Sequence, residues 1–324
     1  MTTWLIRRLI QALFVIIAMS VIVFIGVHVV GNPVDILISP EADQAERARI
    51  ITSMGLDQPL WRQYAYFLYG ALHGDLGRSF VFNEPALLLI AQRMPATMEL
   101  AITAVLFSII FGVPLGLYAG LKPDGFLGRT ILAGSILGFS LPSFWVGLML
   151  IMVFAVELGW LPSTGRGQTV TVFGIPWSFL TWDGLRHMLM PAVNLSLYNI
   201  SLVLRLSRAG VRETLPMDFV KFARAKGLST SRVIFVHVLK NIMIPIVTVL
   251  GLELGSTIAF AVVTETVFAW PGMGKLIIDS INVLDRPVIV AYLMMIVLLF
   301  IVINLVVDVL YMILDPRVRL ERNS

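Results

Sequence analysis

The chain has 324 residues, of which 58% are hydrophobic and only 14% are charged, and its formal net charge is +4. Because a soluble domain carries about 25% charged residues, this composition excludes an ordinary soluble globular protein and indicates a polytopic membrane protein. The chain has no cysteine, which excludes a disulfide framework and a thiolate metal site.

Six apolar stretches are long enough to cross a bilayer, which takes about 20 helical residues. The predicted spans are Leu9–Val30, Met98–Gly120, Ile131–Glu157, His187–Leu206, Ile242–Phe268 and Val288–Leu314. The first is longer than the apolar region of a signal peptide, which has about 7–15 residues, and lacks a small-x-small cleavage site. It is therefore interpreted as a retained helix. The predicted fold class is an all-α polytopic membrane protein with six transmembrane helices.

The spans divide the chain into predicted regions. Residues 1–30 form the first transmembrane helix, 31–97 an extracytoplasmic lid, 98–314 a five-helix core with a cytoplasmic loop at 207–241, and 315–324 a cytoplasmic tail. The direction follows from the cations, which favour cytoplasmic loops. We predict that both termini are cytoplasmic, because this orientation leaves few cations in the two short outer loops. These are Arg166, Arg186, Lys275 and Arg286.

Two amphipathic helices are predicted in the lid. Ser39 and Pro40 predict the start of the first helix, and Gly55 predicts its end. The second starts near Pro59 and ends at His73. The apolar face of the second helix carries Leu60, Tyr64, Phe67, Leu68 and Leu72. The lid is either purely structural or a docking surface for an external partner.

Smaller patterns predict further contacts. The alternation Thr169-Val-Thr-Val-Phe173 predicts a short hairpin in the second outer loop. Small residues, mostly glycines, that recur every fourth residue predict close approach of another helix. They are Gly112, Gly116 and Gly120 in the second span, with Gly251, Gly255 and Ala259 in the fifth and the pair Gly134 and Gly138 in the third.

No catalytic constellation is evident in the sequence. Gly272-Met-Gly274-Lys275 lacks the spacing of a phosphate-binding loop, and the four histidines are scattered without metal-ligand spacing. The chain is therefore predicted to be no enzyme and to bind no metal or cofactor itself.

Two polar residues inside the spans are candidates for a translocation path. Glu253 lies near the middle of the fifth span, where a charge costs about 2.5–3.5 kcal/mol and usually faces water or the bundle interior. A protonated, hydrogen-bonded glutamate between helices is the alternative for Glu253. Asn194 in the fourth span is a second path candidate, or else, with Asn199, a hydrogen bond between helices.

The cytoplasmic loop contains a basic stretch with aromatic and small residues. Phe219, Phe222, Ala223 and Lys226 fall on one side of a predicted short helix that ends at Gly227, and Ser229 caps the next helix. Aromatic anchors beside small residues favour a helix that docks into a groove of a soluble partner. The alternative is a solvated basic linker. The candidate docking residues are Asp218, Phe219, Phe222, Ala223, Arg224, Ala225, Lys226 and Gly227.

The same stretch resembles the permease subunits of ATP-binding-cassette importers, in the dipeptide, oligopeptide and nickel branch. The family signature, E-A-A-x-x-x-G, aligns here as Lys221-Phe222-Ala223 followed by Gly227, so the glutamate is replaced by lysine. Matches elsewhere include Gly55-Leu-Asp-Gln-Pro59, His73-Gly-Asp-Leu-Gly77, Thr264-Glu-Thr-Val-Phe268 and Trp270-Pro-Gly-Met-Gly274.

This resemblance implies a subunit of a bacterial inner (cytoplasmic) membrane importer for peptides or peptide-like solutes. It implies a second homologous permease subunit, two ATPases that hold ATP and magnesium, and an extracytoplasmic solute-binding protein. The residues around Pro216–Leu228 would be the coupling helix that sits in an ATPase groove. Two alternatives are a secondary transporter that uses Glu253 as an ion or proton site and a membrane scaffold without transport.

Overall fold

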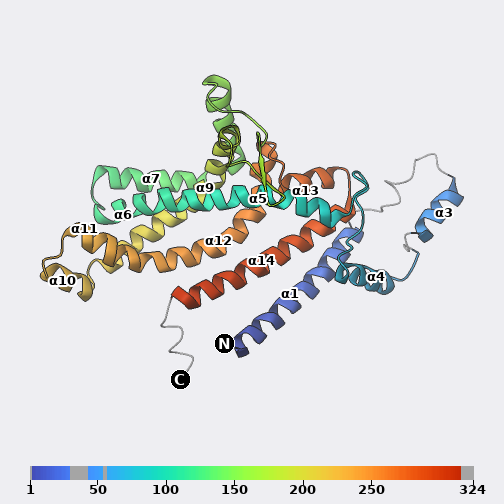
Figure 1. Ribbon diagram of the computed structural model, residues 1–324, viewed down its shortest axis with the longest axis horizontal. Helices are drawn as coiled ribbons and strands as arrows, with labels where there is room; N and C mark the ends of the chain where they lie inside the picture. Colours follow the sequence, from blue (N-terminus) through green and yellow to red (C-terminus); the bar gives the residue numbers. More distant parts are fainter. Residues whose placement is uncertain (1, 30–42, 54–56, 315–324) are drawn as a thin grey trace. The chain divides into compact units, whose positions relative to one another are not determined.

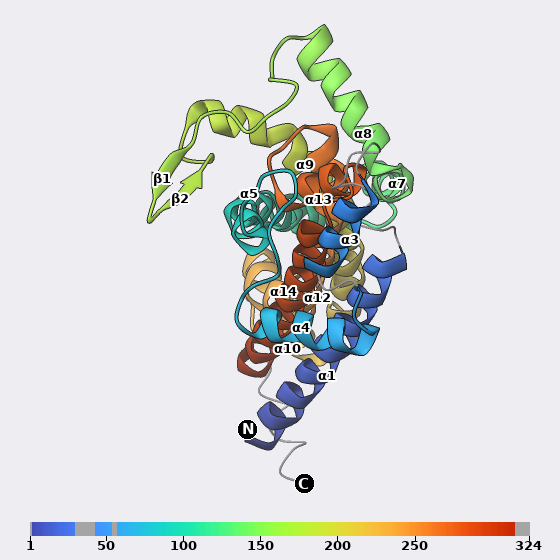
Figure 2. The same ribbon diagram turned by 90° about the vertical axis from the view of Figure 1, so that its right-hand side faces the viewer.

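The computed structural model describes residues 2–29, 43–53 and 57–314, and these are mostly helical (Figures 1 and 2). The chain forms two compact units. The first comprises Met1–Pro95 and Pro271–Val302, and the second comprises Ala96–Trp270 and Ile303–Ser324. The predicted cytoplasmic tail and the residues Ser39, Pro40 and Gly55 lie outside the described residues.

The first unit contains the lid helices. Its elements are α1 (Thr2–Val29), α3 (Gln44–Ser53), α4 (Leu60–Leu72), α13 (Met273–Asn282) and the first part of α14 (Arg286–Leu314). Helix α4 begins directly after Pro59, as predicted, and packs on α1. Tyr64 shares a 2.8 Å hydrogen bond with Ser20, and its ring meets that of Phe24 edge-on with centroids 5.3 Å apart. Leu60 and Leu72, at the two ends of α4, remain exposed.

A buried carboxylate joins two distant segments of this unit. Asp285, just before α14, accepts hydrogen bonds from the Ser79 hydroxyl and, at 3.1 Å, from the Phe80 backbone N–H. The Ser79 hydroxyl oxygen in turn accepts from the N–H of Phe82 at 2.9 Å. Because Asp285 is fully buried, these bonds supply the partners that a buried carboxylate requires.

The second unit is built around one long helix, α9 (Trp182–Thr214), which packs against helices on several sides (Figure 1). Its neighbours are α6 (Val113–Leu121), α7 (Phe126–Ser140), α8 (Ser143–Leu150) and α12 (Leu239–Val267). Helix α9 begins after Thr181, whose hydroxyl accepts a 2.9 Å bond from the Gly184 N–H and caps the helix. The remaining elements are the part of α5 (Ala86–Phe107) that follows Pro95, η1 (Ser108–Gly112), η2 (Ile151–Glu157), β1 (Val170–Val172), β2 (Ile175–Trp177), α10 (Asp218–Ala225), α11 (Thr230–Arg232), η3 (Val233–Val238) and the last part of α14.

Five continuous helical stretches of the described chain are long and apolar enough to cross a membrane, and a bent pair gives a sixth. The number of spans agrees with the prediction, but several bounds differ. The second span begins at Ala86 rather than Met98, and the fourth extends over Trp182–Thr214. Both extensions carry polar residues, which hydropathy alone excludes from a span although the helix continues through them.

The predicted third span, Ile131–Glu157, is not one continuous helix. Helix α7 ends at Ser140, α8 begins at Ser143, and the two are bent by 107° (Figure 2). The cause is Pro142, whose ring disfavours helical geometry in the residue before it. Leu141 accordingly takes an extended conformation, with φ −80° and ψ 135°.

The glycine stripe of the second span packs on α9, as predicted. A Cβ at Gly112 would lie 2.9 Å from Val203, and one at Gly120 would lie 2.8 Å from Val211. At Gly116 a Cβ would overlap the backbone oxygen of Leu204. By contrast, a Cβ at Gly134 in α7 meets nothing within 4 Å. The stripe therefore sets the closest approach of two helices, whereas Gly134 does not.

Gly116→Ala tests this packing. The added methyl must push α6 away from α9, and overpacking of this kind costs about 1–3 kcal/mol. We expect a thermal midpoint several degrees lower for the purified protein in detergent. The matched control is Gly134→Ala, which should leave the midpoint unchanged or raise it, because alanine is the better helix former. Equal midpoints for the two variants would contradict this assignment of the stripe.

Candidate functional site

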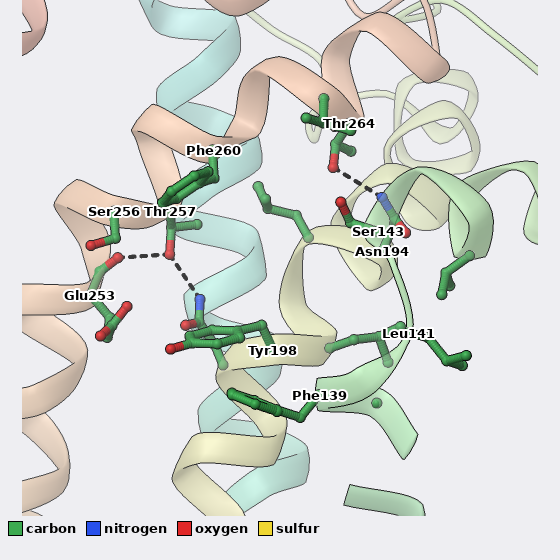
Figure 3. Close-up of a pocket in the computed structure, with 16 residues that line it drawn as sticks. Phe139, Leu141, Ser143, Asn194, Tyr198, Glu253, Ser256, Thr257, Phe260 and Thr264 are labelled. Carbon is green, nitrogen blue, oxygen red and sulfur yellow. Dashed lines mark hydrogen bonds between the residues drawn. The ribbon is translucent and has the colours of Figure 1, made fainter. Parts of the chain in front are cut away.

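A mainly apolar pocket that also carries polar side chains lies between α7, α8, α9 and α12, with a volume of about 520 Å³ (Figure 3). Both path candidates, Glu253 and Asn194, line it. Side chains from all four helices line the pocket. Those labelled in Figure 3 are Phe139, Leu141, Ser143, Asn194, Tyr198, Glu253, Ser256, Thr257, Phe260 and Thr264.

Two asparagine side chains hold α9 against α12 beside this pocket. Asn194 Nδ2 donates to Thr264 Oγ1 at 3.0 Å, and Asn199 Nδ2 donates to Thr257 Oγ1 at 2.8 Å. Such bonds between membrane helices contribute about 0.6–1.7 kcal/mol each. Both asparagines are buried. The predicted role of Asn194 and Asn199 in joining helices is therefore confirmed, and Asn194 also lines the pocket.

Glu253 differs from these asparagines because its side chain makes no hydrogen bond to another described helix. It is half-buried, and its backbone oxygen accepts a 2.8 Å bond from the Thr257 hydroxyl. No hydrogen bond or ion pair reaches its carboxylate from the part of the chain that the structure describes. It is also the only acidic or basic residue lining the pocket. The described residues therefore do not form the alternative arrangement, in which Glu253 is hydrogen-bonded between two helices.

Aromatic rings form one side of the pocket. The rings of Phe139 and Tyr198 stack with centroids 5.3 Å apart and an interplanar angle of 28°. The Arg205 guanidinium lies over the ring of Phe139, 4.8 Å from its centroid. These contacts order α7 against α9 at the pocket and fix the positions of both rings.

Sequence reasoning missed a buried ion pair that anchors the second outer loop. Arg166 Nη2 donates to Glu99 Oε2 at 2.6 Å, and both side chains are at least nine-tenths buried. Glu99 Oε1 also accepts from the N–H groups of Ser178 and Phe179, at 2.8 and 2.9 Å. The Glu99 carboxylate thus accepts hydrogen bonds from three residues of the loop. The residues are too far apart in sequence for any spacing rule to pair them.

The anchored loop carries the predicted hairpin. Strands β1 and β2 pair antiparallel, with Val170 opposite Trp177 and Val172 opposite Ile175. The connecting residues Phe173 and Gly174 have φ of +52° and +78°, as a two-residue turn of this twist requires. The Phe173 side chain is fully exposed at the tip.

The predicted short cytoplasmic helix is α10, and its two faces differ. Phe222 is 62% exposed and Phe219 is 42% exposed. Lys226 Nζ lies 4.6 Å from the centroid of the Phe222 ring. Asp218 pairs with Lys221 at 2.9 Å. The exposed face therefore presents aromatic carbon among charges, and Arg224 and Ala225 lie on exposed surface as well.

The opposite face of α10 is part of the protein's own core. Val220 and Ala223 are buried in a cluster with Val211 of α9, Val233 of η3 and Ile242 of α12. Ala223 was expected to leave room for an approaching partner, but this chain already occupies the space around it. Helix α10 ends at Ala225, and Gly227, two residues later, has φ +75° and so terminates the helical turn, while Ser229 caps α11. Both end signals are confirmed.

The chain matches two models of known protein families. Residues 112–320 match the family described as binding-protein-dependent transport system inner membrane component, and residues 1–101 match the N-terminal model for such membrane components.

Two curated relatives match almost the whole chain. The dipeptide transport system permease protein DppB of Escherichia coli (strain K12) is 34% identical, over 98% of this chain and 99% of its own. The glutathione transport system permease protein GsiC of the same strain is 37% identical over the same shares. A solved structure of the inward-facing MetNI methionine ABC transporter matches with a TM-score of 0.53 and 16% identity, covering 70% of this chain and 97% of that chain. That structural likeness shows the fold alone.

Glu99→Gln tests the anchor of the outer loop. The change leaves Arg166 buried without its counter-charge, and breaking a buried pair in this way costs about 3–5 kcal/mol. We expect the Ser178 and Phe179 amides to exchange hydrogen at least tenfold faster. Glu157→Gln, which removes an exposed carboxylate, serves as the control and should change neither amide. Unchanged exchange in Glu99→Gln would show that the pair does not hold the loop.

Proposed function

The chain belongs to the family of binding-protein-dependent transport system inner membrane components, and we propose that it forms half of the path of an ATP-driven importer for peptides or peptide-like solutes. Its place as a multi-pass subunit of the inner membrane follows from the family and from its apolar helices. The cargo class is supported by the names of relatives that match nearly full length, one for dipeptides and one for glutathione.

The proposed assembly contains this chain and a second homologous permease, two ATPase subunits and an extracytoplasmic solute-binding protein. ATP and magnesium belong to the ATPases, which supply the energy by hydrolysis. In this chain the sequence offers no phosphate-binding loop. The chain's task is then to convert movement of the ATPases into opening and closing of a path.

The observation that carries this proposal is the two-sided character of α10. Its exposed face, with Phe219 and Phe222, supplies aromatic anchors of the kind that dominate docking interfaces. Its buried face, with Val220 and Ala223, packs against η3 and belongs to an apolar cluster that includes residues of α9 and α12. A partner that moves α10 therefore moves both helices, because close-packed cores transmit displacement instead of absorbing it.

The pocket between α9 and α12 is the proposed part of the path in this chain. Glu253 and Asn194 line it, and both are on helices that share an apolar cluster with α10. Alternating access then requires that the assembly bind ATP more tightly in one of two arrangements of these helices.

Phe222→Ala tests docking through α10. Truncation of a central aromatic anchor typically costs 2 kcal/mol or more of binding free energy. We therefore expect peptide uptake by the reconstituted complex to fall at least tenfold, with weaker retention of the ATPase subunits on purification. Because Phe222 is exposed, the thermal midpoint of this chain alone should not change.

The control for this test is Phe173→Ala at the hairpin tip, on the other side of the membrane. It removes an equally large exposed ring and should leave ATPase retention intact. Normal uptake and normal ATPase retention in Phe222→Ala would contradict the proposed coupling role.

Ala223→Glu should give a different outcome. It places a carboxylate inside the chain's own apolar cluster, where an unpaired charge is strongly unfavourable. We expect a lower thermal midpoint for the isolated chain as well as lost uptake. A midpoint equal to that of the unchanged protein would contradict the burial of this face.

A further inference from the structure

Resting on the proposed importer function, we propose that the pocket between α9 and α12 binds the primary ammonium group of the cargo during its passage, with Glu253 as the counter-charge. This assigns a chemical selectivity to the permease itself, in addition to any selectivity of the solute-binding protein.

The first support is charge. The carboxylate of Glu253 is the only acidic or basic side chain that lines the pocket, and no described residue neutralises it. An ionised carboxylate in a partly apolar site gains most from a cation that also donates hydrogen bonds. A primary ammonium group offers both, with three N–H donors.

The second support is a surplus of hydrogen-bond acceptors. Thr257 has one hydroxyl proton and donates it to the backbone oxygen of Glu253, so it can only accept from Asn199. Asn199 must therefore turn its amide nitrogen to Thr257, which leaves its Oδ1 as a buried acceptor without a partner among the described residues. Asn194 Oδ1 is in the same condition, although Asn194 is only 3% exposed.

Glu253, Asn194 and Asn199 all line one pocket, but the two Oδ1 atoms are covered in this arrangement, so a ligand reaches them only when the side chains around them move. Since a buried acceptor without a donor costs about 1–3 kcal/mol, the pocket favours a ligand rich in N–H groups. A peptide supplies such donors from its amino terminus and its amide.

The third support is aromatic. Tyr198 and Phe260 line the same pocket as Glu253, whereas the ring of Phe139 is already covered by Tyr198 and by the Arg205 guanidinium. Aromatic faces attract ammonium groups by about 0.5–2 kcal/mol. Rings and carboxylate together favour cations over neutral or anionic groups. The volume of about 520 Å³ lies within the range of small-molecule sites, about 300–1,000 Å³.

The lack of cysteine in this chain allows a direct test of the charge. Ser256 lines the pocket one turn from Glu253 on the same face of α12, so Ser256→Cys places a single thiol beside the carboxylate. In the assembled complex this thiol is modified with a trimethylammonium and with a sulfonate methanethiosulfonate reagent. We expect the ratio of the cationic to the anionic rate to fall about tenfold when Glu253→Gln is added.

Uptake by the complex reconstituted with ATP is the second measurement. Glu253→Gln should slow uptake of a dipeptide with a free amino terminus about tenfold, because a charge-assisted hydrogen bond is lost. Glu253→Asp should retain most of the rate. The control, Glu157→Gln, removes an exposed carboxylate outside the pocket and should change neither uptake nor the reagent ratio.

An unchanged reagent ratio or unchanged uptake in Glu253→Gln overturns the ammonium site and leaves the importer function standing. A complex with the unchanged chain that takes up no peptide under ATP overturns the importer function instead. The two failures are distinguished because the second appears without any substitution.

Discussion

The burial of α10 in an apolar cluster shared with α9, η3 and α12 is the interaction on which the proposed coupling depends. Val220 and Ala223 are buried in an apolar cluster that also includes Val211, Val233 and Ile242. Full burial of a valine side chain stabilises by about 1.5–3 kcal/mol, so α10 is held as part of the helical core. The same helix presents Phe219 and Phe222 outward. One short element therefore has an inner face for its own chain and an exposed outer face, which the proposed assembly assigns to a partner.

Polar groups and glycines inside the helical core join the helices to one another. Two asparagine–threonine bonds hold α9 beside α12, and the glycine stripe brings α6 close to α9 from another side. In lipid, where apolar surfaces gain little from meeting one another, close approach and hydrogen bonds are what joins helices. Glu253 takes part in neither kind of contact through its side chain. Its carboxylate is left to act on whatever enters the pocket.

Much of this arrangement could be predicted because it is local in sequence. The spans, the hairpin, the glycine stripe and the stop at Gly227 each depend on residues a few positions apart. The bend after Ser140 was missed because hydropathy continues through Pro142, although the proline itself was a local signal for the break. Short motifs were also enough to predict membership of an importer family, and two family models confirm this prediction.

The rest of the site depends on contacts that no spacing reveals. Glu99 and Arg166 meet through the tertiary fold, and sequence gave no reason to pair them. The side of α10 that carries Ala223 could not be assigned either, because the same alanine suits a partner's surface and the chain's own core equally well. Only the position of η3 and α12 beside it decides that Ala223 faces inward.

The most direct test of this account is an intrachain distance measured in the assembled complex by pulsed electron paramagnetic resonance. Spin labels at Lys221→Cys in α10 and Leu252→Cys in α12 replace exposed side chains outside the pocket and should not disturb the core. The account predicts one narrow distance distribution that is the same without nucleotide and with ATP bound, because α10 and α12 move together. A distance that changes on ATP binding would contradict the claim that α10 is rigidly joined to the helices of the pocket.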